Sequence, residues 1–186
     1  MVAVVGVTGT PGPGKKSIAP LLAERLGRGC LGLNDFARSH GLVKGLEGEV
    51  DPLALKRVLA RELRGDMVVF GHLFPEVLGK SSVEKVAVLR CEPTVLKGRL
   101  RPRRYPAQQL VDNLEAELIG LTSADTFKTF GSRRTFEVDT THTTPPEAAS
   151  FVANVLRGKA APGPRIDWTM DYDSSRKLKS LFSEAL

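Results

Sequence analysis

A glycine-rich loop near the N-terminus restricts the folds that are open to this chain. Residues 2–8 are apolar and largely β-branched, as in a parallel strand buried on both faces, and residues 15–26 carry apolar side chains at helical spacing. Between these segments lies Gly9-Thr10-Pro11-Gly12-Pro13-Gly14-Lys15, which matches the pattern G-x-x-x-x-G-K. In that pattern glycines let backbone N–H groups turn toward phosphate oxygens, and the helix N-terminus adds partial positive charge. The sequence therefore predicts a phosphate-binding loop (P-loop), with Lys15 exposed and able to reach β- and γ-phosphates.

The rest of the chain alternates strands with helices. Short apolar runs predict strands at 31–33, 67–70, 83–90 and 135–138, and helical periodicity predicts helices at about 35–40, 53–63, 94–100, 108–121 and 145–156. In the 108–121 helix one face carries Leu110, Leu114, Leu118 and Leu121. Residues 41–51 contain three glycines and are expected to form a mobile loop. This alternation predicts an α/β fold in which a five-stranded parallel sheet is flanked by helices.

The composition changes after Arg157. Residues 158–164 are rich in Gly, Ala and Pro, which favours a linker, and residues 175–186 form a last amphipathic segment. We therefore expect one domain over residues 1–160, followed by a linker and an amphipathic tail over residues 161–186.

Composition and cysteine usage favour a soluble cytoplasmic protein. Of the 186 residues 41% are hydrophobic and 26% charged, which is typical of a globular domain. The apolar runs are far shorter than the roughly 18 residues that a membrane span needs, and no basic stretch precedes an apolar run as in a signal peptide. Cys30 and Cys91 have no metal-ligand spacing and are expected to be reduced and mostly buried. No membrane partner is expected.

Two positions depart from the usual magnesium-binding pattern of a P-loop protein. The eighth position of the loop motif is normally Ser or Thr, whose hydroxyl binds Mg²⁺, but here it is Lys16, and Ser17 follows. A strand end nearby normally carries an acidic residue, but the 67–70 strand ends in Phe70. His72 follows closely, and it is either a site residue near the phosphates or a structural histidine.

The positive charge of the chain is concentrated in one segment. The chain has 27 Lys and Arg against 21 Asp and Glu, a net charge of +6. Residues 97–104 contain no acid and five basic residues, which are Lys97, Arg99, Arg101, Arg103 and Arg104. An exposed helix face usually interleaves acids, so this run favours a bound anion, with an ordinary basic surface as the alternative.

Further segments follow the P-loop in a fixed order. They are Asp35-Phe36-Ala37-Arg38, Gly71-His72, Val88-Leu89-Arg90, Leu96 with Arg99-Leu100, Arg103-Arg104-Tyr105, Asp112-Asn113-Leu114 with Glu117, and Ile166-Asp167-Trp168. Together with the P-loop they span about residues 1–168 and resemble the adenylate kinase isoenzyme 6 family. Its members are small nucleoside monophosphate kinases of the P-loop class that are also known as ribosome-assembly factors. The P-loop alone is generic, whereas the later segments together are much more specific.

The resemblance implies ATP and Mg²⁺ as cofactors and assigns roles to particular residues. The residues implied to bind ATP phosphates are Gly12, Gly14, Lys15, Lys16 and Ser17, with Ser17 also a weak Mg²⁺ contact, direct or through water. Catalytic roles are implied for Lys15, His72 and Arg103, the last as the arginine of a mobile lid over about residues 100–112. A second mobile segment, about residues 33–55, would bind the monophosphate through Asp35 and Arg38. The family's acid is replaced by Phe70, and its lid glycine by Arg104.

Several functions remain open at this level. The resemblance implies transfer of the ATP γ-phosphate to AMP or a related monophosphate, with accompanying ATPase activity. It also implies a role in maturation of the small ribosomal subunit through a platform protein, with RNA contacted only indirectly. Lys16 and Phe70 favour an alternative, a degenerate P-loop module that binds nucleotide and turns it over poorly. A different small-molecule kinase on the same fold is a further alternative.

Overall fold

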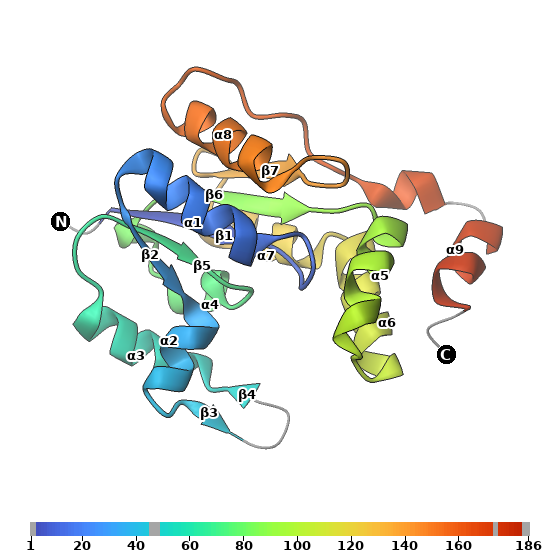
Figure 1. Cartoon of the computed structure of the whole chain (residues 1–186), viewed down its shortest axis with the longest axis horizontal. Coiled ribbons are helices and arrows are strands. Elements are labelled where there is room, and N and C mark those ends of the chain that lie inside the picture. Colours follow the sequence, from blue (N-terminus) through green and yellow to red (C-terminus); the bar gives the residue numbers. More distant parts are fainter. Residues whose placement is uncertain (1–2, 45–48, 173–174, 184–186) are drawn as a thin grey trace.

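A five-stranded parallel sheet forms the centre of the molecule (Figure 1). The computed structural model describes residues 3–44, 49–172 and 175–183. The strands are β1 (Val4–Thr8), β2 (Gly29–Gly32), β5 (Met67–Phe70), β6 (Val83–Arg90) and β7 (Thr135–Asp139). Their order across the sheet is β2-β5-β1-β6-β7, and every pair is parallel. The predicted fold class is confirmed, and β1, which leads into the P-loop, is the central strand.

Helices cover both faces of this sheet. On one face, α1 (Lys15–Leu26) and α8 (Pro145–Leu156) share a core with β1, β5, β6 and β7. On the other face, the second core is built from α2 (Leu33–Ser39), α3 (Pro52–Glu62), α4 (Phe74–Val77) and α7 (Leu121–Phe130). A short 3-10 turn, η1 (Lys80–Ser82), precedes β6. Because the sheet is buried on both faces, its strands are apolar runs rather than alternating ones.

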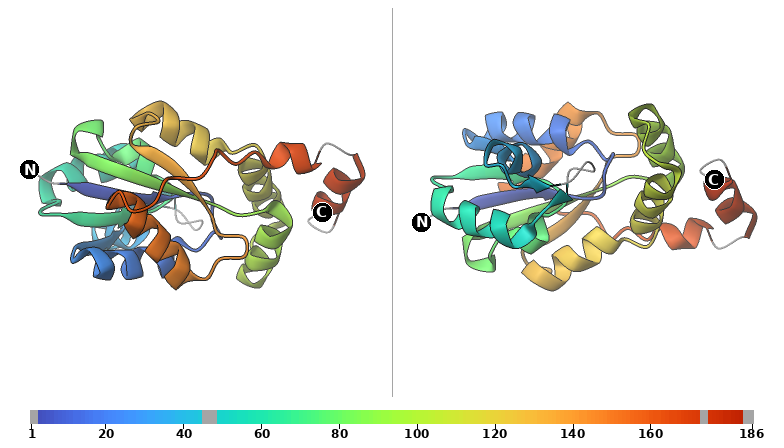
Figure 2. Two further views of the ribbon diagram at one scale, coloured as in Figure 1. Left: turned by 90° about the horizontal axis from the view of Figure 1, so that it is seen from above. Right: turned by 90° about the horizontal axis from the view of Figure 1, so that it is seen from below.

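A third core lies beyond the carboxyl end of β6. It joins α5 (Pro93–Leu100) and α6 (Ala107–Leu118) to the C-terminal segment, which forms η3 (Trp168–Tyr172) and α9 (Ser175–Phe182). Between α5 and α6 lies the short 3-10 helix η2 (Arg101–Arg103). Tyr172 and Leu181 are buried in this core, and Figure 2 shows η3 and α9 lying outside α5 and α6, at the end of the molecule away from the N-terminus. The amphipathic tail thus has a definite packing partner.

The second strand differs from the prediction of 31–33, because it spans Gly29–Gly32 and Leu33 already begins α2. Glycine normally weakens a strand signal, which hid this one. Here both glycines admit large neighbours on β5. A Cβ atom at Gly29 would lie 2.4 Å from Met67 Sδ, and one at Gly32 would lie 2.7 Å from Phe70 Cζ.

The predicted irregular loop at 41–51 contains a small antiparallel sheet. Its strands are β3 (Val43–Lys44) and β4 (Glu49–Val50), and residues 45–48 lie outside the described residues. Val43 and Val50 are partly buried against the second core, which explains why this segment has regular structure. Asp51 then caps α3, because its side chain accepts from the backbone N–H groups of Leu53 and Ala54 at 2.9 and 3.2 Å.

The predicted single helix at 108–121 is two helices. Helix α6 ends at Leu118, and Gly120 adopts a left-handed conformation with φ of 67° before α7 begins at Leu121. Glycine reaches this conformation without a steric cost, so the chain turns there. Leu121 is consequently 49% exposed and does not extend the leucine face of α6. The helices α4 and α7 were not predicted from the sequence.

The structure also tests the predictions about the two cysteines and about membrane-spanning segments. Cys91 is buried, as expected, but Cys30 is exposed, because its strand β2 lies at the edge of the sheet. In the described part of the chain, no helix combines the length and apolar character needed to cross a bilayer.

Candidate active site

The P-loop connects the carboxyl end of β1 to the first turn of α1. Gly12 has φ of 106°, and a Cβ atom there would lie 2.3 Å from Leu96 Cδ1, so a side chain would collide with α5. Gly14 is the N-cap of α1, with φ of 105°. The first N–H groups of a helix have no partner within the helix, so α1 presents free donors at this loop. The loop conformation and the helix N-terminus are together suited to phosphate oxygens.

Lys15 is half-buried rather than exposed as the sequence predicted. Its Nζ atom donates to the carbonyl oxygens of Gly9 and Thr10 at 2.7 and 2.6 Å. Burial lowers the pKa of Lys15 to about 7; the Glu117 carboxylate opposes this shift and the Arg103 guanidinium adds to it. The ammonium group of Lys15 therefore lies against the backbone of the P-loop.

Lys16 points toward the segment that follows the second strand. Its ammonium lies 3.9 Å from the Asp35 carboxylate of α2, and the two side chains are 74% and 62% exposed. Arg38 is also exposed and lies one turn after Asp35 on the same side of α2. The P-loop helix and the predicted monophosphate segment are therefore close together at Lys16 and Asp35.

The oxygen ligands near the P-loop are suited to a magnesium ion that is bound mainly by nucleotide phosphates. Mg²⁺ prefers oxygen ligands and often takes only one or two from the protein, with phosphates and water supplying the rest. Ser17, in the first turn of α1, offers an exposed hydroxyl. Phe70 is half-buried against the first core, and its ring fills the space beside Gly32. Among the described residues, no group of three or more His, Cys, Asp or Glu side chains could hold a metal ion by itself.

His72 lies beside the P-loop because backbone bonds hold the end of β5 to the end of β1. Gly71 donates to the Val7 carbonyl at 3.2 Å and accepts from the Thr8 hydroxyl at 2.9 Å. The His72 side chain is exposed on the surface. Its pKa is lowered because neighbouring protein atoms displace part of its hydration and because the Lys15 ammonium repels a second positive charge. His72 thus lies near Lys15, and its role as a site residue stays a prediction.

The basic run at 97–104 divides into two groups. Lys97 is buried and donates to the Leu181 carbonyl of α9 at 2.6 Å, and Arg99 donates to the Thr140 carbonyl at 2.7 Å. Arg103 and Arg104 are exposed. The run is therefore neither one uniform anion-binding cluster nor one solvated surface, because its first part anchors the tail and the segment after β7.

The predicted lid contains an unusual backbone conformation. Arg104 has φ of 52°. Among the residues that the structure describes, it is the only one other than glycine with a positive φ. Left-handed backbone is a conformation that glycine reaches freely, so it explains why the resembling family carries glycine at this position. Arg103 precedes this bend, and its Nη1 lies 3.5 Å from the Tyr105 hydroxyl. The Arg103 guanidinium also contributes, after burial, to the lowered pKa of Lys15.

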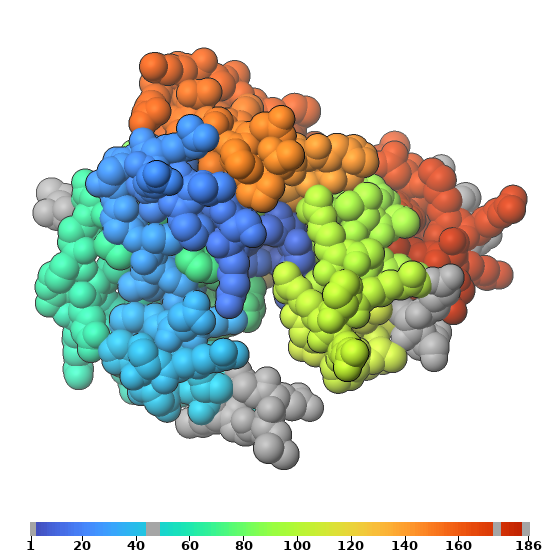
Figure 3. Space-filling model, viewed as in Figure 1, coloured from blue at the N-terminus to red at the C-terminus, as the bar shows by residue number. Residues whose placement is uncertain are grey.

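The space-filling view shows where these parts meet. A cleft separates α2 and its neighbouring strands from α5 and α6, and the P-loop and α1, in blue, lie between them (Figure 3). The structure thus brings Lys15, Lys16, Asp35 and His72 together at the carboxyl end of the sheet, and the Arg103 guanidinium is near enough to lower the pKa of Lys15.

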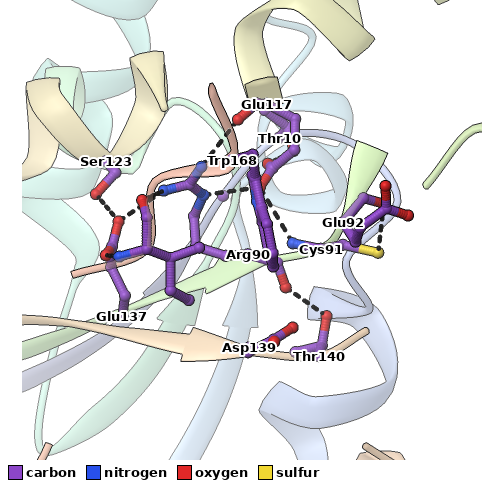
Figure 4. Close-up of polar contacts among 12 residues, drawn as sticks. Thr10, Arg90, Cys91, Glu92, Glu117, Ser123, Glu137, Asp139, Thr140 and Trp168 are labelled. Carbon is purple, nitrogen blue, oxygen red and sulfur yellow. Dashed lines mark hydrogen bonds and ion pairs between the residues drawn. The ribbon is translucent and has the colours of Figure 1, made fainter. Parts of the chain in front are cut away.

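The motif resemblance included Arg90, Glu117 and Trp168, but the sequence did not predict that they meet in a buried polar cluster behind the P-loop. Thr10 donates to Glu117 of α6, and Glu117 is paired with Arg90 at the end of β6 (Figure 4). Two features of the sequence pointed to this cluster. Arg90 is a charged residue at the end of an apolar strand, and Glu117 is a carboxylate beside the apolar face of a helix. Either alone is uninformative, because pairing across 27 residues is not visible in local periodicity.

Comparison with known proteins agrees with the motif resemblance. The sequence profile of the family described as an AAA domain matches residues 5–120. A protein of Thermococcus kodakarensis named "Putative adenylate kinase" is 35% identical, over 91% of this chain and 95% of that protein. Proteins of the same name from Pyrococcus abyssi and Methanothermobacter thermautotrophicus are 35% and 34% identical, covering 91% and 89% of this chain and 93% and 97% of theirs. The chain belongs to this adenylate kinase family.

Solved structures of small-molecule kinases share the fold of the family. Shikimate kinase from Acinetobacter baumannii superposes with a TM-score of 0.59 at 19% identity, over 84% of this chain and 93% of that one. Shikimate kinase from Bacteroides thetaiotaomicron gives a TM-score of 0.61 at 16% identity, over 83% and 98%. At these identities the likeness concerns the fold alone. Family and fold together support a kinase-type phosphotransferase.

Proposed function

We propose that this chain is a nucleoside monophosphate kinase that transfers the γ-phosphoryl group of ATP to AMP or a related monophosphate. The observation that carries the proposal is the arrangement around Lys15. Asp35 of the 33–55 segment lies 3.9 Å from Lys16, which directly follows the P-loop lysine, and the Arg103 guanidinium of the lid contributes to the lowered pKa of Lys15. Transfer between two phosphates requires two nucleotides held in line, and a P-loop between two such segments provides a place for each.

The chemistry assigns simple tasks to the protein. The bond between the γ-phosphorus and the β–γ bridging oxygen breaks, and an oxygen of the acceptor phosphate forms the new bond. Lys15 exchanges the carbonyl oxygens of Gly9 and Thr10 for phosphate oxygens and offsets their negative charge. Arg103 closes over ATP, and Arg38 with Asp35 receives the monophosphate. Ser17 is the residue that would contact Mg²⁺ through its hydroxyl, directly or through water, and the ion would supply additional positive charge to the nucleotide phosphates.

A second candidate is a nucleotide-binding module with slow turnover. It is favoured by Lys16 at the usual hydroxyl position and by the ring of Phe70 at the strand end where a carboxylate would hold the metal's water shell. ATP hydrolysis without an acceptor is a third outcome that the same site permits.

One nucleotide panel separates these candidates. ADP is quantified by chromatography after incubation of ATP and Mg²⁺ with AMP, GMP, CMP or UMP, and with ATP alone. Lys15→Ala prepared in parallel reports contaminating kinases. The kinase proposal expects ADP formation that depends on a monophosphate. Equal ADP in every arm indicates an ATPase, and ATP binding by calorimetry without ADP in any arm indicates the slow module.

The motif resemblance extends the proposal to maturation of the small ribosomal subunit. Its support is the family pattern, which continues through Ile166-Asp167-Trp168 in the tail. A pull-down with purified small-subunit platform proteins, with and without ATP, tests this role. ATP-dependent retention of one protein supports it, and retention of none rejects it. The free thiols of Cys30 and Cys91 are compatible with the reducing cytoplasm, where we place the reaction.

A further inference from the structure

The carboxylate of Glu117 is the centre of the buried polar cluster in Figure 4. Glu117 is 1% exposed. Its Oε1 atom accepts from Arg90 Nε at 2.7 Å, from the Cys91 N–H at 3.1 Å and from Trp168 Nε1 at 3.2 Å. Its Oε2 atom accepts from the Thr10 hydroxyl at 2.5 Å. Four donors fix this carboxylate, and three of them belong to the sheet end and the tail.

The fourth donor belongs to the P-loop. Thr10 is 3% exposed, and its hydroxyl is directed to Glu117 while its carbonyl oxygen accepts from Lys15 Nζ at 2.6 Å. A chain of contacts therefore runs from Glu117 through Thr10 to Lys15. It joins residues that are 107 positions apart in the sequence.

The opposite side of the cluster is anchored in the core. Arg90 also donates to Glu137 of β7 at 2.7 Å and to the Ile166 carbonyl at 3.1 Å. Glu137 accepts in addition from the Ser123 hydroxyl of α7. Arg90 donates in addition to the Glu117 carbonyl at 2.8 Å. Because Arg90 has two carboxylate partners and two carbonyl partners, it holds Glu117 in place from the end of β6. Ser123 belongs to the same cluster but lies on the side away from the P-loop.

We propose that Glu117 is a positioning residue that, through Thr10, fixes the P-loop and Lys15 against α6. The inference rests on the proposed function, because it concerns the same phosphate-binding site. A buried hydroxyl on a carboxylate restricts Thr10 to one rotamer, which fixes the peptide that Lys15 contacts. Catalysis by positioning is sensitive to small displacements, so loss of this restraint raises the barrier even though Glu117 does not touch the nucleotide.

The test compares two deletions of a hydroxyl group from the same cluster. Thr10→Val keeps the shape of the side chain and removes the donor to Glu117, and Thr10→Ser restores it. Ser123→Ala is the matched control, because it removes the donor to Glu137 without touching the P-loop. We expect Thr10→Val to lower kcat/KM for ATP about tenfold while KM for AMP is unchanged, because only ATP contacts the P-loop. Thr10→Ser is expected to recover most of this loss, and Ser123→Ala to change only the melting temperature.

The outcomes separate this inference from the proposed function. If wild type forms ADP and Thr10→Val and Ser123→Ala have equal kcat/KM values, the positioning role is overturned. Failure of Thr10→Ser to recover activity also overturns it. If wild type forms no ADP with any monophosphate, the proposed function fails, and calorimetric ATP affinity then decides the inference. Affinity about tenfold weaker in Thr10→Val than in Ser123→Ala supports it, and equal affinity rejects it.

Discussion

Lys15 donates to the carbonyl oxygen of Thr10, five residues earlier in the chain, at 2.6 Å. The Lys15 side chain therefore folds back over the P-loop, and its Nζ atom also donates to the carbonyl oxygen of Gly9 at 2.7 Å. An ammonium group held this way is desolvated, which explains why the pKa of Lys15 is lowered to about 7. The N-terminus of α1 and the charge of Lys15 therefore act at the same place in the loop.

Lys15→Ala is expected to reduce nucleotide turnover more than tenfold, which corresponds to about 1.4 kcal/mol on the barrier. The melting temperature is expected to stay close to wild type, because loss of two hydrogen bonds is offset by loss of a desolvated charge. Lys56→Ala, an exposed lysine on α3, is the control. Initial rates of ADP formation and thermal unfolding measured on the same preparations check the prediction. Retention of more than a tenth of the activity would place the site elsewhere.

Arg103→Ala is expected to lower turnover more than Arg101→Ala. The reason is that the charge of Arg103 acts on Lys15, whereas that of Arg101 acts on Lys97 beside the tail. Steady-state kinetics with ATP as the varied substrate measures the difference. Equal and small effects of the two substitutions would contradict a lid role for Arg103.

Phe70→Asp is expected to destabilise the protein without improving its use of magnesium. The ring of Phe70 packs against the first core and beside Gly32, so an ionised carboxylate there loses apolar contacts and hydration. The expected loss is several kcal/mol of unfolding free energy, and Phe70→Leu is expected to lose less. Melting temperature and the Mg²⁺ concentration for half-maximal rate are measured together. A stable Asp variant with a lower Mg²⁺ requirement would show instead that Phe70 weakens a metal site.

Arg90→Met is expected to be strongly destabilising. It leaves Glu117 and Glu137, which are 1% and 4% exposed, without their shared cation. Breaking a buried ion pair by removing one partner typically costs about 3–5 kcal/mol. Arg157→Met, the same change at an exposed residue of the chain, is expected to stay within about 0.5 kcal/mol. Urea unfolding measures both. Similar midpoints for the two variants would mean that the buried cluster contributes little.

His40 gives the fold a stabilising contribution that depends on pH. Its ring lies 2.8 Å from the Phe36 carbonyl and 2.8 Å from the Glu62 carboxylate. The hydrogen bond to Phe36 and then that to Glu62 raise the pKa of His40 above 6.5. A raised folded-state pKa stabilises the folded form below the unfolded-state value, and the contribution is lost as pH rises through the folded-state value.

We therefore expect the melting-temperature difference between wild type and His40→Gln to be larger at about pH 5.5 than at about pH 8.5. His142→Gln, at an exposed position after β7, provides the comparison. A difference that is constant between the two pH values would show that His40 contributes no charge-dependent stability.

The P-loop and the sheet could be predicted from the sequence because both are encoded locally. Residues 9–15 carry their own turn-forming glycines and lie between a strand and a helix of clear periodicity. Family motifs then supplied Asp35, Arg38, His72 and Arg103 as site candidates. The structure places Lys16 beside Asp35, the Arg103 guanidinium helps to lower the pKa of Lys15, and the Lys15 ammonium helps to lower the pKa of His72. Their roles in catalysis stay predictions until the variants are measured.

Other features depended on contacts between distant residues. Gly29 and Gly32 belong to a strand that pairs with β5, where Met67 and Phe70 fill the space that other side chains at these positions would need. Lys97 is part of a basic run in sequence, yet in the structure it is buried on the carbonyl of Leu181. No local pattern distinguishes a lysine that binds an anion from one that anchors a helix, because the two differ only in what is packed against them.

The sequence by itself determined the α/β alternation, the P-loop and the chemistry that its lysine can perform, because apolar periodicity and glycine positions act over a few residues. Only the tertiary structure decided that Thr10, Arg90 and Trp168 meet at one carboxylate, that of Glu117. The physical reason is desolvation. A carboxylate is stable in the core only where several donors from different elements reach it together, and that condition is met by the folded chain as a whole.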